Sequence, residues 1–127
     1  MNLVTPLNRV LGLGSAKSGG AHWWMQRITA VALVPLGLWF ALSLLAMPDF
    51  EYTTVIAWLQ RPISSILLIL TVLAVSYHSY LGLQVVIEDY VQTASLKILA
   101  LLASTFAHFG LSVAALFAIL KVAFAPA

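Results

Sequence analysis

Three long runs of apolar residues dominate this chain of 127 residues. They cover residues 28–47, 63–87 and 98–124, and the first run carries no charged residue. A helix needs about 20 apolar residues to cross a hydrocarbon core of roughly 30 Å, so each run is long enough to span a membrane. Barrel strands would alternate polar and apolar residues over about 10 positions, which these runs do not do. The sequence therefore predicts an all-α membrane protein with three transmembrane helices.

The composition excludes several other classes of protein. Hydrophobic residues make up 62% of the chain and charged residues 8%, whereas soluble domains are about 25% charged. The absence of cysteine excludes a disulfide framework, a thiolate zinc site, an iron–sulfur cluster and a thiol nucleophile. The net charge of +2 comes without a basic cluster, so we expect contact with lipid and no binding to nucleic acid.

The chain divides into a short arm and one membrane unit. Residues 1–21 are rich in glycine and are expected to form a flexible N-terminal arm, and residues 22–127 are expected to form the three-helix unit. The segment Gly12–Gly14 lacks the preceding strand and the third glycine of a dinucleotide-binding loop. Within the first span, Pro35 removes one backbone hydrogen bond, and this predicts a mild kink.

The basic residues predict the orientation in the membrane. If the N-terminus lies inside, four of the six Lys and Arg residues lie on the inner side: Arg9, Lys17, Arg27 and Lys97. Arg61 and Lys121 then lie on the outer side. Cytoplasmic segments carry an excess of Lys and Arg, so we expect a cytoplasmic N-terminus and a periplasmic C-terminus in a bacterial inner membrane.

His78, in the second span, is the main candidate for function. Ionisable side chains inside a membrane are costly, and they are functional candidates by default. Gly82 lies one turn away on the same helix face, where the missing side chain leaves room for a flat macrocycle such as haem. The alternative is a histidine that bonds to a neighbouring helix.

His108, in the third span, is expected at about the same depth as His78. Two histidines at one depth on adjacent helices can in principle ligate one iron. Ser104, Thr105 and Ser112 flank His108, so local hydrogen bonding explains this residue equally well.

An acid and a phenol follow at the end of the second span. Asp89 lies 11 residues after His78, and 11 steps of 100° return to nearly the same face, about 16 Å further along the helix. The neighbouring Tyr90 can donate a hydrogen bond to a carbonyl, and the carboxylate can orient it or pass protons. The alternative is an ordinary interfacial tyrosine beside a solvated acidic pair.

His22 and Arg27 precede the first span, next to two tryptophans. One interpretation is membrane anchoring together with a positive charge on the inner side. The other is binding of carboxylates, such as haem propionates, for which a guanidinium is well suited.

Two segments, "HWWMQRITAVALVPL" and "HSYLGLQVVIEDYV", resemble the small membrane-anchor subunits of succinate dehydrogenase, which is respiratory complex II. The resemblance covers residues 21–124. It implies that His78 is one axial ligand of a b-type haem, with the second ligand from a companion anchor subunit. It also implies that Tyr90 bonds a ubiquinone carbonyl beside Asp89, and that His22 and Arg27 lie near the haem propionates and the quinone pocket. The family assigns no role to His108.

The resemblance implies a function in electron transport. The chain would pack with a second membrane anchor subunit and hold the flavoprotein and iron–sulfur subunits on the membrane, without catalysis of its own. The anchor of a related fumarate reductase is an alternative, since sequence does not fix the direction of the reaction. An oligomeric channel or assembly protein is a further alternative, but the spans lack the acidic rings of a cation filter.

Overall fold

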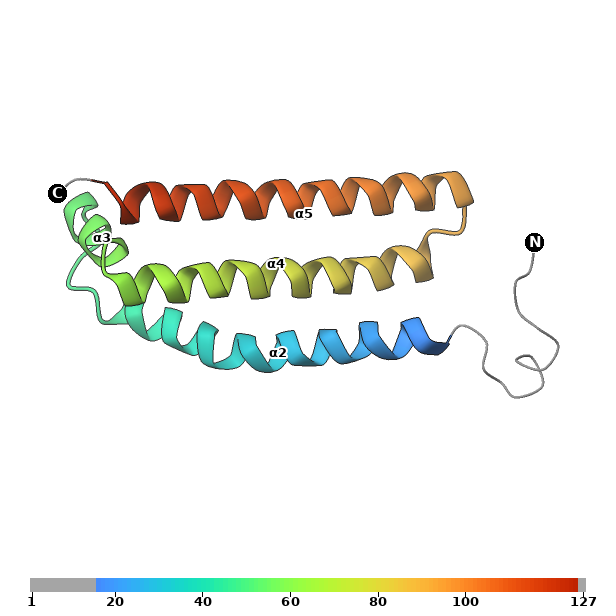
Figure 1. Ribbon diagram of the computed structural model, residues 1–127, viewed down its shortest axis with the longest axis horizontal. Coiled ribbons are helices and arrows are strands. Elements are labelled where there is room, and N and C mark those ends of the chain that lie inside the picture. The colour runs from blue at the N-terminus through green and yellow to red at the C-terminus, as the bar shows by residue number, and fades with distance from the viewer. Residues whose placement is uncertain (1–15, 126–127) are drawn as a thin grey trace.

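The computed structural model describes the backbone of residues 16–125 and the side chains of residues 20–125. This part of the chain forms four helices and no strand: α2 (Ala16–Leu45), α3 (Tyr52–Leu59), α4 (Pro62–Tyr90) and α5 (Ala94–Ala123). The three long helices, α2, α4 and α5 in Figure 1, are apolar and long enough to cross a membrane. The prediction of an all-α protein with three candidate spans is confirmed.

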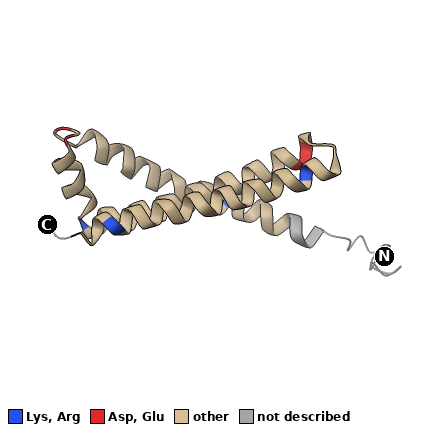
Figure 2. Ribbon diagram, turned by 90° about the horizontal axis from the view of Figure 1, so that it is seen from above, with Lys and Arg blue, Asp and Glu red and all other residues tan. Residues whose placement is uncertain are grey.

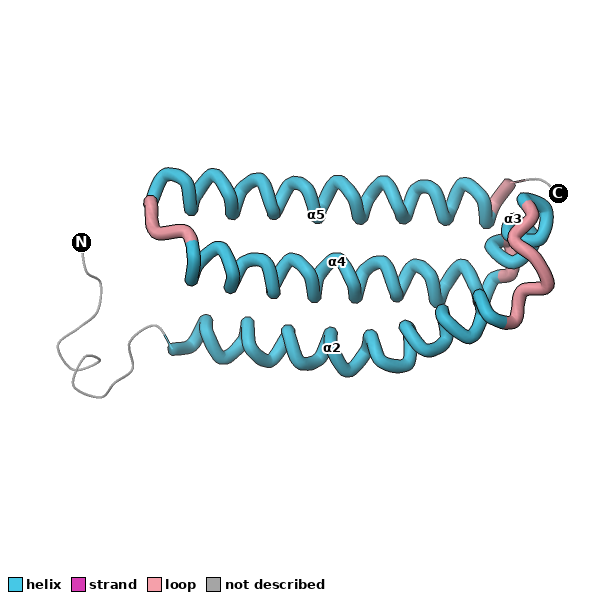
Figure 3. Tube along the Cα trace, turned by 180° about the vertical axis from the view of Figure 1, so that it is seen from behind, coloured by secondary structure: helices cyan, strands magenta, loops and turns pink. Residues whose placement is uncertain are grey.

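The three long helices lie side by side, and α4 is the central one (Figures 1 and 3). α4 packs against α2 on one side and against α5 on the other. Figure 2 shows the same arrangement from above, where α2 crosses the other two helices. Among the described residues, Leu81 and Ile87 are the only buried apolar side chains. The helices therefore present most of their apolar surface outward, which suits lipid and partner helices.

Each long helix begins before the apolar run that predicted it. α2 begins at Ala16 rather than near residue 28, and α5 begins at Ala94 rather than at residue 98. Hydropathy marks only the hydrocarbon part of a helix, while the backbone stays helical through the headgroup region. Residues 16–21 of the expected arm already belong to α2. The rest of that arm lies outside the described residues.

A short helix that the sequence analysis did not predict closes one end of the bundle. α3 contacts both α4 and α5. Its Trp58 ring stacks on Trp39 of α2, with centroids 5.9 Å apart. The hydroxyl of Ser65, in the first turn of α4, donates to the Leu59 carbonyl at the end of α3 over 2.6 Å. Pro62 begins α4, where its fixed φ and missing N–H cost nothing.

α2 runs through Pro35 without a break. Figure 1 shows it as one continuous helix that bends gently, in agreement with the expected mild kink. Proline removes one hydrogen bond of the helix, and packing against α4 keeps the rest of α2 in place.

Charged residues gather at the two ends of the bundle, and the middle of the long helices is almost free of them (Figure 2). At one end, the Lys97 ammonium donates to the carbonyl of Glu88 over 2.8 Å, which links the start of α5 to the end of α4. This distribution fits a bundle that crosses a membrane, because charges are costly in hydrocarbon. Which end lies in the cytoplasm stays a prediction.

Candidate functional site

The imidazole of His78 lies in the interface between α4 and α2. Its Nδ1 atom is 3.0 Å from the hydroxyl oxygen of Thr29 on α2. Its Nε2 atom is 3.4 Å from the side-chain nitrogen of Gln26, also on α2. His78 is half-buried, and Thr29 is only 8% exposed. The predicted membrane histidine is thus held by two side chains of a single neighbouring helix.

These contacts come from a stripe of polar side chains along α2. His22, Gln26 and Thr29 are spaced four and three residues apart, so they lie on one helix face. The Nε2 atom of His22 and the Oε1 atom of Gln26 are buried and have no hydrogen-bond partner among the described residues. Buried polar atoms are nearly always paired in complete structures. The two atoms therefore mark a place where a polar ligand or a partner group fits.

Gly82 lies one turn of α4 beyond His78 and faces the same helix. A Cβ atom added to Gly82 would come within 3.5 Å of the Gln26 side-chain nitrogen, an ordinary van der Waals contact. The predicted shared face of His78 and Gly82 is confirmed by this contact with α2. The glycine lets Gln26 lie close to the α4 backbone. Room for a macrocycle at this place stays a prediction.

Arg27 lies apart from the polar stripe. Its guanidinium carbon lies 4.5 Å from the centroid of the Trp23 ring, one turn back on the same helix, and both side chains are exposed. This is the geometry of a cation–π contact. His22 lies on the same face of α2 as Gln26 and Thr29 and has a buried Nε2 atom, whereas Arg27 is exposed. A propionate-binding role for Arg27 stays a prediction.

Asp89 and Tyr90 lie at the end of α4. Both are exposed, Tyr90 by 81%, and neither side chain bonds to another described residue. Their neighbour Glu88 takes the local contacts, since its carboxylate accepts from the Gln84 amide over 2.8 Å and its carbonyl accepts from Lys97. Tyr90 lies 12 residues from His78, which is about 18 Å along the helix. The part of the chain that the structure describes therefore leaves the phenol and the carboxylate without a hydrogen-bond partner.

His108 packs on the opposite side of α4. Its Nε2 atom is 3.2 Å from the Ser79 hydroxyl, and its Nδ1 atom is 2.8 Å from the Ser104 carbonyl. Its ring and that of Tyr80 form a T-shaped pair, with centroids 5.9 Å apart. Because His78 bonds to α2 and His108 bonds to Ser79, the two histidines do not converge on one iron. The explanation of His108 by local hydrogen bonding is supported.

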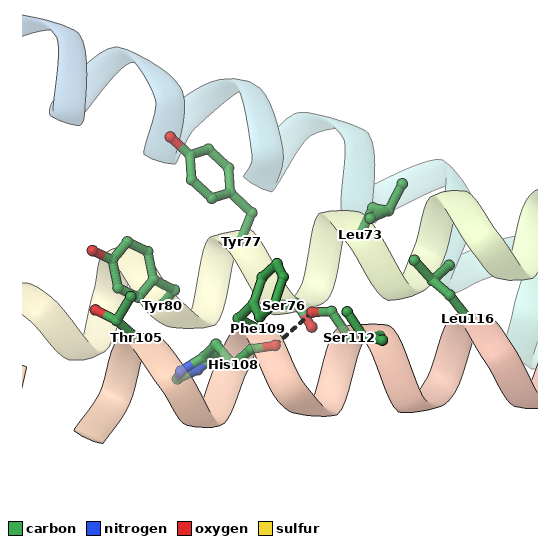
Figure 4. A pocket seen from close by; sticks show the side chains of 10 residues that line it. Leu73, Ser76, Tyr77, Tyr80, Thr105, His108, Phe109, Ser112 and Leu116 are labelled. Atoms are coloured by element: carbon green, nitrogen blue, oxygen red, sulfur yellow. Dashed lines mark hydrogen bonds between the residues drawn. The ribbon is translucent and has the colours of Figure 1, made fainter. Parts of the chain in front are cut away.

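His108 lines a groove between α4 and α5 with a volume of about 610 Å³ (Figure 4). The groove is mainly apolar, with hydroxyl groups at intervals. Its lining comes from these two helices alone: Leu73, Ser76, Tyr77, Tyr80, Thr105, His108, Phe109, Ser112, Val113 and Leu116. It is separate from the polar side chains that surround His78.

Comparison with known proteins places this chain in a family. The family described as "Succinate dehydrogenase/Fumarate reductase transmembrane subunit" matches residues 1–119. The chain belongs to this family. A succinate dehydrogenase hydrophobic membrane anchor subunit of Rickettsia bellii is 46% identical over 84 residues, which are 66% of this chain and 67% of that protein.

Two more distant relatives carry related names. The corresponding subunit of Paracoccus denitrificans is 30% identical over 97 residues, 76% of this chain and 75% of that protein. A succinate dehydrogenase membrane anchor subunit of Reclinomonas americana is 32% identical over 88 residues, 67% of this chain and 73% of that protein. No solved structure matches the chain. The resemblance to succinate dehydrogenase anchors that the sequence motifs indicated is confirmed.

Gln26 and Thr29 are the residues that the sequence analysis missed in this family member. Both stand in the first quoted motif, and their spacing from His22 was a usable signal. Three polar residues on one face of an apolar helix indicate a contact with another polar group. What the sequence did not show is that His78 of α4 is the group they meet.

Proposed function

We propose that this chain is the hydrophobic membrane anchor of a succinate:ubiquinone oxidoreductase. The observation that carries the proposal is the likeness to anchor subunits of that name, at up to 46% identity among the relatives above. The three long apolar helices suit an anchor. The partners are a flavoprotein subunit, an iron–sulfur subunit and a second membrane anchor subunit. Succinate is oxidised on the soluble subunits, and this chain alone is catalytically inert.

The proposal includes a b-type haem shared with the second anchor. When bound, such a haem accepts and releases single electrons. The α2–α4 interface fits it, because buried polar atoms of His22 and Gln26 lack partners beside an imidazole. His78 would ligate the iron through one ring nitrogen. His22 would donate a hydrogen bond to a carboxylate of the haem, and at Gly82 only the Gln26 side chain lies against the α4 backbone.

The proposal also assigns the quinone-reduction site to the end of α4. The Tyr90 hydroxyl donates a hydrogen bond to a carbonyl oxygen of ubiquinone, and the Asp89 carboxylate orients it or passes protons. Conversion of quinone to quinol takes two electrons and two protons. The exposure of both side chains supports a site that the partner subunits complete.

The names of the relatives favour one direction of the reaction. The anchors reported above belong to succinate dehydrogenases, which favours succinate oxidation with quinone as acceptor. The family also includes fumarate reductase subunits, so fumarate reduction is the second candidate. The two are distinguished by the rates of succinate oxidation and fumarate reduction in one preparation.

The proposed location is a bacterial inner membrane. Two of the relatives reported above come from bacteria, Rickettsia bellii and Paracoccus denitrificans. The distribution of Lys and Arg favours a cytoplasmic N-terminus and a periplasmic C-terminus. In this orientation Tyr90 and Asp89 lie on the cytoplasmic side, where the soluble subunits are expected.

The test is to isolate the complex from native membranes through a tag on this chain. The co-purifying subunits are identified, and succinate–quinone reductase activity is measured together with the haem absorbance. Activity and a b-type spectrum support the proposal. The proposal is contradicted if the tagged chain is recovered in an intact assembly that has no succinate–quinone reductase activity and contains no flavoprotein or iron–sulfur subunit.

A further inference from the structure

His78 and His108 differ in whether a ring nitrogen is left without a strong hydrogen-bond partner. The Nδ1 atom of His108 lies 2.8 Å from a backbone carbonyl, which only accepts, so Nδ1 of His108 carries the proton. Its Nε2 atom then accepts from the Ser79 hydroxyl at 3.2 Å. Both nitrogens of His108 are therefore engaged with good donors or acceptors within the chain.

Thr29 determines which ring nitrogen of His78 carries the proton. The Thr29 hydroxyl oxygen lies 2.9 Å from the Met25 carbonyl and 3.0 Å from the Gln26 carbonyl, so its single proton is directed to the backbone of α2. The oxygen then accepts from His78, which puts the imidazole proton on Nδ1 at 3.0 Å. The lone pair of His78 is left on Nε2.

The Nε2 atom of His78 has only a weak partner. The Gln26 amide nitrogen lies 3.4 Å away, beyond the usual range of a strong hydrogen bond. The amide oxygen of the same side chain is buried and unpaired, so Gln26 is not held by a complete set of hydrogen bonds. A ligand that binds Nε2 of His78 therefore displaces only a weak contact. A ligand that binds Nε2 of His108 would displace its hydrogen bond with Ser79.

We propose that Thr29 is the positioning residue of a metal-ligating His78. Its hydroxyl fixes the Nδ1–H tautomer and the ring orientation, so that Nε2 faces the iron of a haem. Histidine ligands usually donate their second ring N–H to such an acceptor, which raises the basicity of the ligating nitrogen. This inference rests on the proposed haem role of His78 and adds a residue of α2 that acts through the ligand.

The test compares complexes isolated from native membranes with three variants of the anchor. Thr29→Val keeps the shape and removes the hydroxyl, and Thr29→Ser keeps the hydroxyl. Thr105→Val is the matched control, because the Thr105 hydroxyl also bonds to a carbonyl one turn back, at 2.8 Å, and does not contact His78. The readouts are haem content per complex, the haem midpoint potential and the electron paramagnetic resonance spectrum of the ferric haem.

We expect Thr29→Val to lower the haem content and raise the midpoint potential of the haem that remains, because a less basic imidazole stabilises ferric iron less. Its ferric spectrum is expected to shift as well. Thr29→Ser is expected to stay near the parent in potential and spectrum, and Thr105→Val to match it. A Thr29→Val complex with unchanged haem content, potential and spectrum overturns the inference. So does equal loss of haem in Thr29→Val and Thr29→Ser, since shape rather than the hydroxyl would then decide.

His78→Ala separates a failure of this inference from a failure of the proposed function. If the haem spectrum survives in His78→Ala, the haem role of His78 is wrong and the role of Thr29 falls with it. If His78→Ala loses the haem while Thr29→Val matches the parent, only the role of Thr29 is wrong.

Discussion

His78 and Ser79 are neighbours on α4 but bond to different helices. His78 bonds to Thr29 of α2, whereas Ser79 bonds to His108 of α5. A step of one residue turns a helix by about 100°, which is enough to move a side chain from one interface to the next. The central helix thus keeps His78 and His108 apart, and of these two only His78 faces α2.

The first prediction concerns His78→Ala. In the isolated complex we expect this variant to lose nearly all haem absorbance while part of the complex still assembles, because the helices and their apolar faces are unchanged. An optical spectrum of the reduced complex, normalised to the co-purifying flavoprotein, measures this. His108→Ala is the control and is expected to retain the haem, since both of its ring nitrogens bond within the chain.

The architecture of the chain was more predictable from the sequence than its side-chain contacts were. Three runs of apolar residues predict three spans, because crossing hydrocarbon demands this length and composition. The short α3 was missed, since eight residues in a connection carry no comparable signal and its position depends on the stacking of Trp58 on Trp39. The depth of His78 and His108 was predictable from counting, but their opposite orientation was not, because this depends on how α4 packs between two helices.

The polar site around His78 was also only partly predictable, because part of it depends on how two helices pair. The shared face of His78 and Gly82 follows from helical spacing alone. The contact of this face with Gln26 and Thr29 depends on the pairing of α2 with α4, which the spacing within one helix does not contain. Tyr90 and Asp89 are exposed and bond to no other described side chain, so the packing of this chain does not explain why an acid and a phenol stand at the end of α4.

The second prediction concerns Gly82. We expect Gly82→Ala to be tolerated, because the added Cβ atom meets the Gln26 side chain at an ordinary 3.5 Å. Gly82→Leu should reduce the haem content several-fold, since a larger side chain enters the space beside Nε2 of His78 and presses on α2. Gly110→Leu is the control, because a Cβ at Gly110 meets nothing within 4 Å. Equal haem content in Gly82→Leu and Gly110→Leu would show that the space at Gly82 is not used.

The third prediction concerns Tyr90→Phe. Loss of one hydrogen bond costs about 0.5–1.5 kcal/mol, so we expect succinate–quinone reductase activity to fall up to about tenfold. Succinate oxidation with an artificial acceptor should be unchanged, because it takes place on another subunit. Tyr52→Phe is the control, since Tyr52 is also highly exposed but begins α3 at the opposite end of the bundle. If both activities of Tyr90→Phe fall together, the role of Tyr90 is structural.

The last prediction concerns the orientation of the chain, and the absence of cysteine makes it direct to test. Phe50→Cys places a thiol in the connection between α2 and α3, and Gln92→Cys places one between α4 and α5, both at exposed positions. With the N-terminus in the cytoplasm, a membrane-impermeant maleimide should label Phe50→Cys in intact spheroplasts. Gln92→Cys should be labelled only after a denaturing detergent opens the membrane and separates the subunits. Mass analysis of the tagged chain gives the extent of labelling. The reverse pattern would place Tyr90 and Asp89 on the periplasmic side, away from the soluble subunits, and would remove the quinone site proposed for the end of α4.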